Sequence, residues 1–165
     1  MKRAFALLMP ALIATAASAA PIGNAVTVKP DASLETLAGT VALAVGRGVE
    51  ANERVVTGPA GATRLRFLDS SVLDVGAGAA VTLDDFVYRG RKAEKAALTM
   101  TKGAFRWVSG SSPKEAYDIK TPLATIGIRG TDFRVDTDEA RSTIRLASGA
   151  INACSRVSQS CALLT

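Results

Sequence analysis

The sequence contains no histidine, and this absence removes several classes of enzyme at once. Without an imidazole side chain, neither a Ser-His-Asp triad nor a Cys-His pair can form. A zinc-type metal site is also disfavoured, because the chain has only two cysteines and no histidine to complete a ligand set. We therefore expect no catalytic residues, no metal and no cofactor, and we expect that the protein is not an enzyme.

One short motif resembles a catalytic site but lacks its context. Residues 111–114, Ser-Ser-Pro-Lys, fit the S-x-x-K pattern of a serine–lysine pair. The proline and the β-rich surroundings argue against the helix that such enzymes use, and neither S-D-N nor K-T-G occurs in the chain. This match does not change the expectation of a non-enzymatic protein.

Long apolar runs are missing except at the start of the chain. Lys2 and Arg3 precede an apolar stretch over residues 4–16, and small residues follow up to Ala19. This pattern is typical of a secretory signal peptide. The apolar stretch is shorter than the roughly 20 residues of a spanning helix, and Pro10 interrupts it, although a retained N-terminal anchor is an alternative. We expect cleavage after Ala19, a periplasmic or secreted protein, and no transmembrane segment in the mature chain.

The charge of the expected mature chain is only mildly positive. Removing residues 1–19 changes the balance from 20 basic and 15 acidic residues to 18 and 15, so the net charge falls from +5 to +3. Such a charge does not argue for a nucleic-acid partner, and we expect none. The remaining 146 of the 165 residues are enough for one real core.

The two cysteines lie close together near the end of the chain. Six residues separate Cys154 from Cys161. In an oxidising compartment this spacing predicts a disulfide across a hairpin, with two unpaired thiols as the alternative. Closing such a loop would contribute about 2.5 kcal/mol in the chain-entropy treatment.

Short alternating apolar stretches predict an all-β domain. Turn residues recur about every 8–12 positions, and no window sustains a helical repeat. Phase changes at glycines favour a coiled arrangement. We therefore predict one all-β domain of short strands with many turns, either a solenoid-like β-roll or a sandwich. We expect a lead-in segment over residues 20–39, the β domain over residues 40–165 and a charged loop over residues 89–95.

The stretch TPLATIGIRGTDFRV, residues 121–135, changes phase in the middle. Ile128 and Phe133 are an odd number of positions apart, so a regular strand would place them on opposite faces. A bulge or corner at Arg129-Gly130 would return both side chains to one core. We predict that Gly130 adopts a positive φ or sits in a bulge.

Arg129 has two interpretations at this corner. A largely buried arginine could hold the corner by pairing with a carboxylate, and Asp132 and Asp69 are the candidates. Alternatively, the arginine could belong to a recognition surface. We expect the structural role.

The remaining candidate contacts are basic and aromatic. Arg89, Arg91 and Lys92 form a basic cluster that either contacts an anionic partner or is simply a solvated hairpin tip. Arg106 and Trp107 are an arginine–tryptophan pair of the kind enriched in binding hot spots. The alternation also allows Trp107 to lie in the core. These five residues are our candidate partner contacts.

Three blocks of the sequence resemble the FecR-type domain, a family of periplasmic sensors and anti-sigma regulators. The first is NERVVTG followed by residues 64–88, and the second is LTMTKGAFRWVSG. The third is the TP-x-A-T-I-G-x-R-G-T run, whose motif positions we take as structural: Thr121, Pro122, Gly127, Arg129, Gly130 and Thr131. The chain departs from the family at residues 69–71, where Asp-Ser-Ser replaces the usual Asp-Gly-Ser, and a different turn type could result.

The resemblance implies a mostly β extracytoplasmic domain that perceives or transmits a signal by protein contact. Full-length sensors similar to these place the domain after a cytoplasmic segment and a transmembrane helix. Because a signal peptide takes that place here, we expect a stand-alone exported module that binds another envelope protein or a ligand. The alternative is a structural envelope protein that binds glycan or helps to assemble a surface complex.

Overall fold

The computed structural model describes residues 20–165, so the predicted signal peptide lies outside the described residues. Within this part of the chain, strands are joined by turns and by one short 3-10 helix, η1 (Lys114–Ala116), with no α-helix. None of residues 20–165 forms a helix long and apolar enough to cross a membrane. The prediction of a single all-β domain is confirmed.

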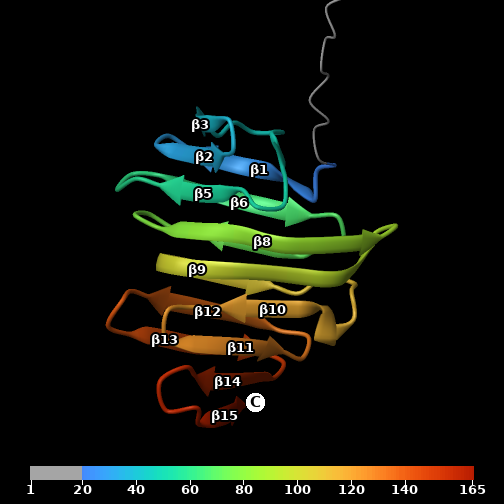
Figure 1. Cartoon of the computed structure of the whole chain (residues 1–165), viewed down its shortest axis with the longest axis vertical. Helices are drawn as coiled ribbons and strands as arrows, with labels where there is room; N and C mark the ends of the chain where they lie inside the picture. Colours follow the sequence, from blue (N-terminus) through green and yellow to red (C-terminus); the bar gives the residue numbers. More distant parts are fainter. Residues whose placement is uncertain (1–19) are drawn as a thin grey trace, which may run out of the picture.

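The strands lie in two layers, which we call sheet A and sheet B, and in both layers the strands follow one another along the long axis of the molecule (Figure 1). Sheet A contains, in order, β4 (Gly48–Val49), β1 (Gly23–Lys29), β6 (Ala62–Phe67), β7 (Val72–Val75), part of β9 (Lys92–Val108), β12 (Asp132–Thr137) and β13 (Ser142–Ser148). Sheet B contains β3 (Gly39–Ala42), β2 (Ala32–Thr36), β5 (Arg54–Thr57), β8 (Ala80–Arg89), the rest of β9, β10 (Tyr117–Lys120), β11 (Ala124–Ile128), β14 (Ile151–Ser155) and β15 (Cys161–Leu164).

Strand β9 belongs to both layers and joins them. Its first part, residues 92–102, pairs with β8, and its last part, residues 103–108, pairs with β12. The change falls at Gly103, whose φ is 105°. A Cβ atom at this position would lie 2.4 Å from the Cβ of Ala79, so only glycine fits the crossing.

The core lies between the two layers and is closed by aromatic side chains. Phe67 of sheet A stacks on Phe86 of sheet B with ring centroids 5.2 Å apart. Trp107 of sheet A meets Tyr117 of sheet B edge-on at 5.5 Å. Trp107 is fully buried. The interpretation of Trp107 as a partner contact is therefore wrong, because the alternation of β9 turns this side chain inward and its neighbour Arg106 outward.

The corner at Arg129-Gly130 carries the chain from β11 in sheet B to β12 in sheet A. Gly130 has a φ of 73°, which confirms the predicted positive φ. Ile128 and Phe133 are both buried in the common core, as the phase change predicted. Arg129 itself is exposed, so the expectation of a largely buried arginine is wrong.

The carboxylates that we expected beside Arg129 have other partners. Asp132 binds Arg106, and Asp69 accepts hydrogen bonds from hydroxyl groups. The corner is instead held by its backbone, since the amide of Arg129 donates to the carbonyl of Ala150 at 2.9 Å.

The segment over residues 89–95 is not a loop, and that expectation is also wrong. It forms the end of the long β8–β9 hairpin, with Arg89 opposite Lys92 and a two-residue turn between them. Alanine and lysine have low β-propensity, but pairing with β8 overrides that preference. The hairpin projects beyond the neighbouring strands at one side of the molecule (Figure 1).

Both ends of the described chain are built into the fold. The expected lead-in contains β1 and β2, which pair with β6 and β5, so these residues are part of the sheets. At the other end, Cys154 and Cys161 face each other across β14 and β15 and form the predicted disulfide.

Candidate functional site

A buried polar cluster surrounds Asp69, in the turn between β6 and β7. The carboxylate is 1% exposed. One carboxylate oxygen accepts from the amide and hydroxyl of Ser71 at 3.0 and 2.6 Å. The other accepts from the hydroxyls of Ser112 and Tyr117 at 2.7 and 2.6 Å. Burial alone would raise the pKa of Asp69, but these hydrogen bonds outweigh it and hold the pKa below its ordinary value.

This cluster connects segments that are distant in the sequence. The Ser112 hydroxyl also accepts from the amide of Ala93 at 2.7 Å, and the Ser111 amide donates to the carbonyl of Asp69 at 2.9 Å. Both serines of the S-x-x-K match are thus engaged in hydrogen bonds that hold the fold together. The cluster ties the β6–β7 turn of sheet A to the loop before β10 of sheet B.

The outer surface of sheet A is the best candidate for binding. Strands such as β6 and β12 bury every second side chain and expose the ones between. The exposed positions are rich in arginine. We call this surface the arginine face; its charged residues are Lys29, Arg64, Arg66, Asp74, Arg106, Asp132, Arg134, Asp136 and Arg145.

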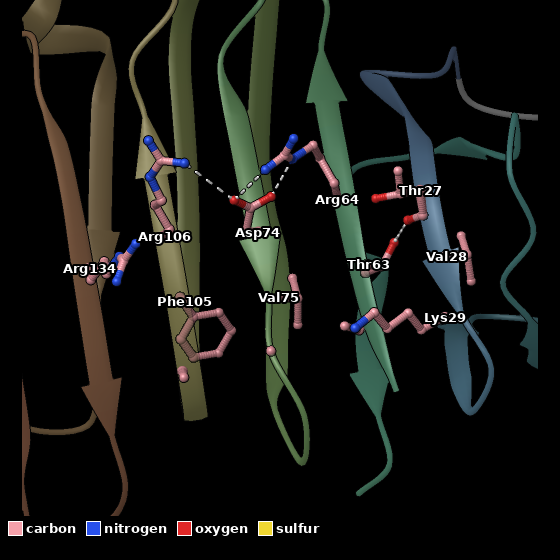
Figure 2. A pocket seen from close by; sticks show the side chains of 13 residues that line it. Thr27, Val28, Lys29, Thr63, Arg64, Asp74, Val75, Phe105, Arg106 and Arg134 are labelled. Carbon is pink, nitrogen blue, oxygen red and sulfur yellow. Dashed lines mark hydrogen bonds and ion pairs between the residues drawn. The ribbon is translucent and has the colours of Figure 1, made fainter. Parts of the chain in front are cut away.

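Charged side chains form one continuous row across five strands of this face. Strand register places Arg64, Asp74, Arg106, Arg134 and Arg145 directly opposite one another on successive strands. Two of the arginines lie on either side of Asp74 in Figure 2. Arg64 donates two hydrogen bonds to the Asp74 carboxylate, and the one from Nη2 to Oδ2 is 2.9 Å long. Nη1 of Arg106 lies 3.9 Å from the same Oδ2.

The other two aspartates flank this row. Arg106 holds Asp132 with two hydrogen bonds of 2.9 and 2.6 Å, and Arg145 holds Asp136 at 2.6 Å. The hydrogen bond from Arg106 lowers the pKa of Asp132, against the opposing effect of burial. Because both members of this pair stay charged at neutral pH, the face presents fixed positive and negative groups.

A shallow groove of about 710 Å³ crosses the arginine face next to the row (Figure 2). Its charged lining consists of Arg64, Arg106, Arg134 and Asp74, with Lys29 further along. Small residues line it as well: Ala62, Gly76 and Ala104. The groove therefore combines small apolar residues with a rim whose net charge is positive.

The structure separates the predicted partner contacts. Arg106 lies in the arginine face, whereas Arg89, Arg91 and Lys92 are exposed at the β8–β9 hairpin tip. Arg89 forms an ion pair with Glu94 at 2.8 Å. Arg91 lines a second hollow together with Arg66 and therefore continues the positive surface.

Sequence reasoning missed four arginines of this face: Arg64, Arg66, Arg134 and Arg145. The available signal was alternation, because arginines occupy every second position in RLRF and the outward positions of FRV and IRL. Nothing in one sequence shows that these strands lie side by side, so the row could not be assembled.

The predicted motif residues of the third block shape the backbone. Thr121 closes a turn, since its hydroxyl accepts from the amide of Ala124 at 2.9 Å, and Pro122 lies within that turn. Gly127 lies in β11 opposite Asn152. Thr131 is buried after the corner, and its amide donates to the Ser109 hydroxyl at 3.2 Å.

Over residues 20–165, the two-layered β fold presents a broad, charged outer surface on sheet A. The sequence matches the family model described as FecR protein over residues 53–152, which is 100 of the 165 residues. The chain belongs to the FecR protein family. It matches no curated protein.

Two solved structures share this fold. Both are crystal structures of a protein provisionally described as an anti-sigma factor, from Parabacteroides distasonis, at 1.65 and 2.50 Å resolution. Their TM-scores are 0.54 and 0.55, each at 14% sequence identity and over 67% of this chain. The match spans 50% of the length of that protein, so this chain corresponds to about half of it.

Proposed function

We propose that the protein is an exported, non-enzymatic FecR-type module that binds another envelope protein during signal sensing. The arginine face is the observation that carries this proposal. It is broad and solvent-facing, and it crosses strands from β1 to β13, as a protein–protein contact requires. Membership of the FecR protein family and the fold shared with the provisional anti-sigma factor support a role in signalling.

Export is the second part of the proposal. The N-terminal pattern ending at Ala19 supports it, and so does the disulfide between Cys154 and Cys161, because disulfides persist in oxidising compartments. Intact-mass measurement of the protein from a periplasmic fraction tests both features. We expect the mass without residues 1–19 and no alkylation before reduction. A precursor mass, or alkylation without reduction, would contradict export in this form.

A capture experiment tests the binding function. The tagged mature protein is incubated with a solubilised envelope fraction and, separately, with purified sacculi. We expect one defined protein partner in the first and no retention in the second. Retention on the sacculi without a protein partner would favour the alternative, a structural envelope protein that binds glycan.

A further inference from the structure

Arg134 occupies an unusual position in the row of the arginine face. It stands directly between Arg106 and Arg145 on the adjacent strands. Like charges directly opposite one another destabilise a sheet. The two outer arginines each have a carboxylate of their own, Asp132 and Asp136. Among residues 20–165, no ion pair or hydrogen bond engages the guanidinium of Arg134, although its charge contributes to the lowered pKa of Asp132.

We propose that Arg134 and the groove beside it bind an acidic segment of the partner protein, with a carboxylate of that segment held by the Arg134 guanidinium. This inference rests on the proposed function and names the chemistry of its partner. A carboxylate there would supply the counter-charge that the centre of the row lacks.

Other arginines of this face bind carboxylates within the domain itself. Arg64 and Arg106 both grip carboxylates through two nitrogens. The rigid fork of an arginine matches a carboxylate in this way. Arg134 has the same side chain, is exposed and lines the groove, so a carboxylate from outside can reach it.

The shape of the groove favours a polypeptide. The groove is lined by the small residues Ala62, Gly76 and Ala104, next to the long arginine side chains of the row. An extended chain can lie on these small residues with apolar contacts while its acidic side chains reach the rim. A heavily phosphorylated glycan would fill the rim but would leave these small residues without complementary contacts.

The charge distribution also points to an acidic partner. The arginine face carries six basic and three acidic residues, a net charge of +3. Residues 20–165 carry 18 basic and 15 acidic residues in total, so the rest of this region has 12 of each and is neutral. The excess positive charge of the domain is therefore concentrated on this surface, where it can steer a negative partner.

The test uses a fluorescein-labelled peptide of about ten glutamates and fluorescence anisotropy at about 0.01 M salt, where the Debye length is about 30 Å. We expect the mature protein to bind this probe. Arg134→Gln should weaken binding about three- to fivefold, the upper part of the range for one exposed charge pair. The control Arg129→Gln removes an equally exposed arginine at the β11–β12 corner and should change binding less than about twofold.

Three results of the anisotropy experiment would overturn the inference. The first is that the mature protein does not bind the polyglutamate probe. The second is that Arg129→Gln weakens binding of the probe as much as Arg134→Gln does. The third is that the protein binds inorganic polyphosphate through Arg134 but does not bind polyglutamate. Unchanged circular dichroism of Arg134→Gln confirms that folding is intact. The capture experiment separates the two proposals: a partner retained equally by Arg134→Gln leaves the proposed function standing and refutes this inference. Failure of the unmodified protein to capture any partner refutes the proposed function, and with it the inference about an acidic segment of that partner.

Discussion

The Asp69 carboxylate and the Tyr117 hydroxyl lie 2.6 Å apart inside the domain, although 48 positions separate them in the sequence. The bond joins the β6–β7 turn of sheet A to the first residue of β10 in sheet B. The Tyr117 hydroxyl also accepts from the amide of Gly110 at 3.2 Å. One side chain thus fixes two segments that meet only in the folded state.

Loss of this hydroxyl should destabilise the protein. We expect Tyr117→Phe to lower the free energy of unfolding by about 1–3 kcal/mol, because the Asp69 carboxylate and the Gly110 amide would each lose a buried hydrogen bond. Urea unfolding at neutral pH measures the change.

Tyr88 provides a matched control. Among residues 20–165, its buried hydroxyl has no partner of good hydrogen-bond geometry, although the backbone of Leu68 lies close enough to influence its pKa. Tyr88→Phe should therefore change the free energy of unfolding by no more than about 0.5 kcal/mol. If Tyr88→Phe and Tyr117→Phe lower the free energy of unfolding equally, the hydrogen bond between Tyr117 and Asp69 does not contribute to stability as proposed.

Asp69 should make the stability depend on pH in the acidic range. Its pKa is lower in the folded state than its ordinary value, which is about 3.9 in an unfolded chain. The stabilisation is therefore fully present above about pH 4 and is lost as the pH falls through the folded pKa. We expect the difference in unfolding free energy between the natural protein and Asp69→Asn to shrink below about pH 4.

Comparing the two proteins at each pH removes the contribution of other acids. Glu53, for example, has a pKa that burial raises, so its contribution changes with pH in the opposite sense. A difference that stays constant from pH 7 down to about pH 2 would exclude Asp69 as the source of the acid sensitivity.

The sequence predicted local features of the fold well. Alternation in RLRF, for example, is a local pattern, and in the structure Leu65 and Phe67 lie on the buried face of β6 whereas Arg64 and Arg66 lie on its exposed face. The disulfide also followed from local spacing, as did the change of face at Gly130. These features depend on residues close together in the chain, where side-chain direction follows from backbone geometry.

The candidate site could not be predicted in the same way. Arg106 and Asp132 are 26 positions apart, and they meet only because β9 pairs with β12 in one register. The same limit produced the wrong interpretation of Arg129, whose nearest carboxylate in sequence, Asp132, faces another strand. These contacts depend on the pairing register of strands that are far apart in the chain, and that register cannot be predicted from a single sequence.

Ser70 is a position where the chain departs from the usual Asp-Gly-Ser of the family. The structure keeps the turn that glycine favours, because Ser70 has a φ of 68°. A residue with a Cβ atom is strained in this conformation. We expect Ser70→Gly to raise the free energy of unfolding by about 0.5–1 kcal/mol, after allowing for the greater freedom of glycine in the unfolded chain. A clear loss of stability in thermal or urea unfolding would contradict this account of the turn.

The corner between β11 and β12 should depend on Gly130, and on Gly149 of the β13–β14 connection that packs against it, and not on Arg129. Gly149 has a φ of 88°, and a Cβ atom there would lie 2.1 Å from the carbonyl oxygen of Gly130, which is rigid backbone. We expect Gly149→Ala to lower the free energy of unfolding by more than about 2 kcal/mol, because strain and a steric clash add together. At Gly130 the nearest atom to an added Cβ is the flexible end of Lys114, at 3.3 Å, so Gly130→Ala should cost only about 1–2 kcal/mol.

Two further variants, Gly90→Ala in the β8–β9 turn and Arg129→Ala at the corner, separate the causes. Gly90→Ala introduces a Cβ at a φ of 62° with no atom within 4 Å, so it measures the backbone strain alone. Arg129→Ala removes an exposed side chain and should change the free energy of unfolding by less than about 0.5 kcal/mol. Urea midpoints of all four variants give the comparison. If Arg129→Ala costs as much as Gly149→Ala, the arginine holds the corner in solution, and the backbone explanation of this turn is wrong.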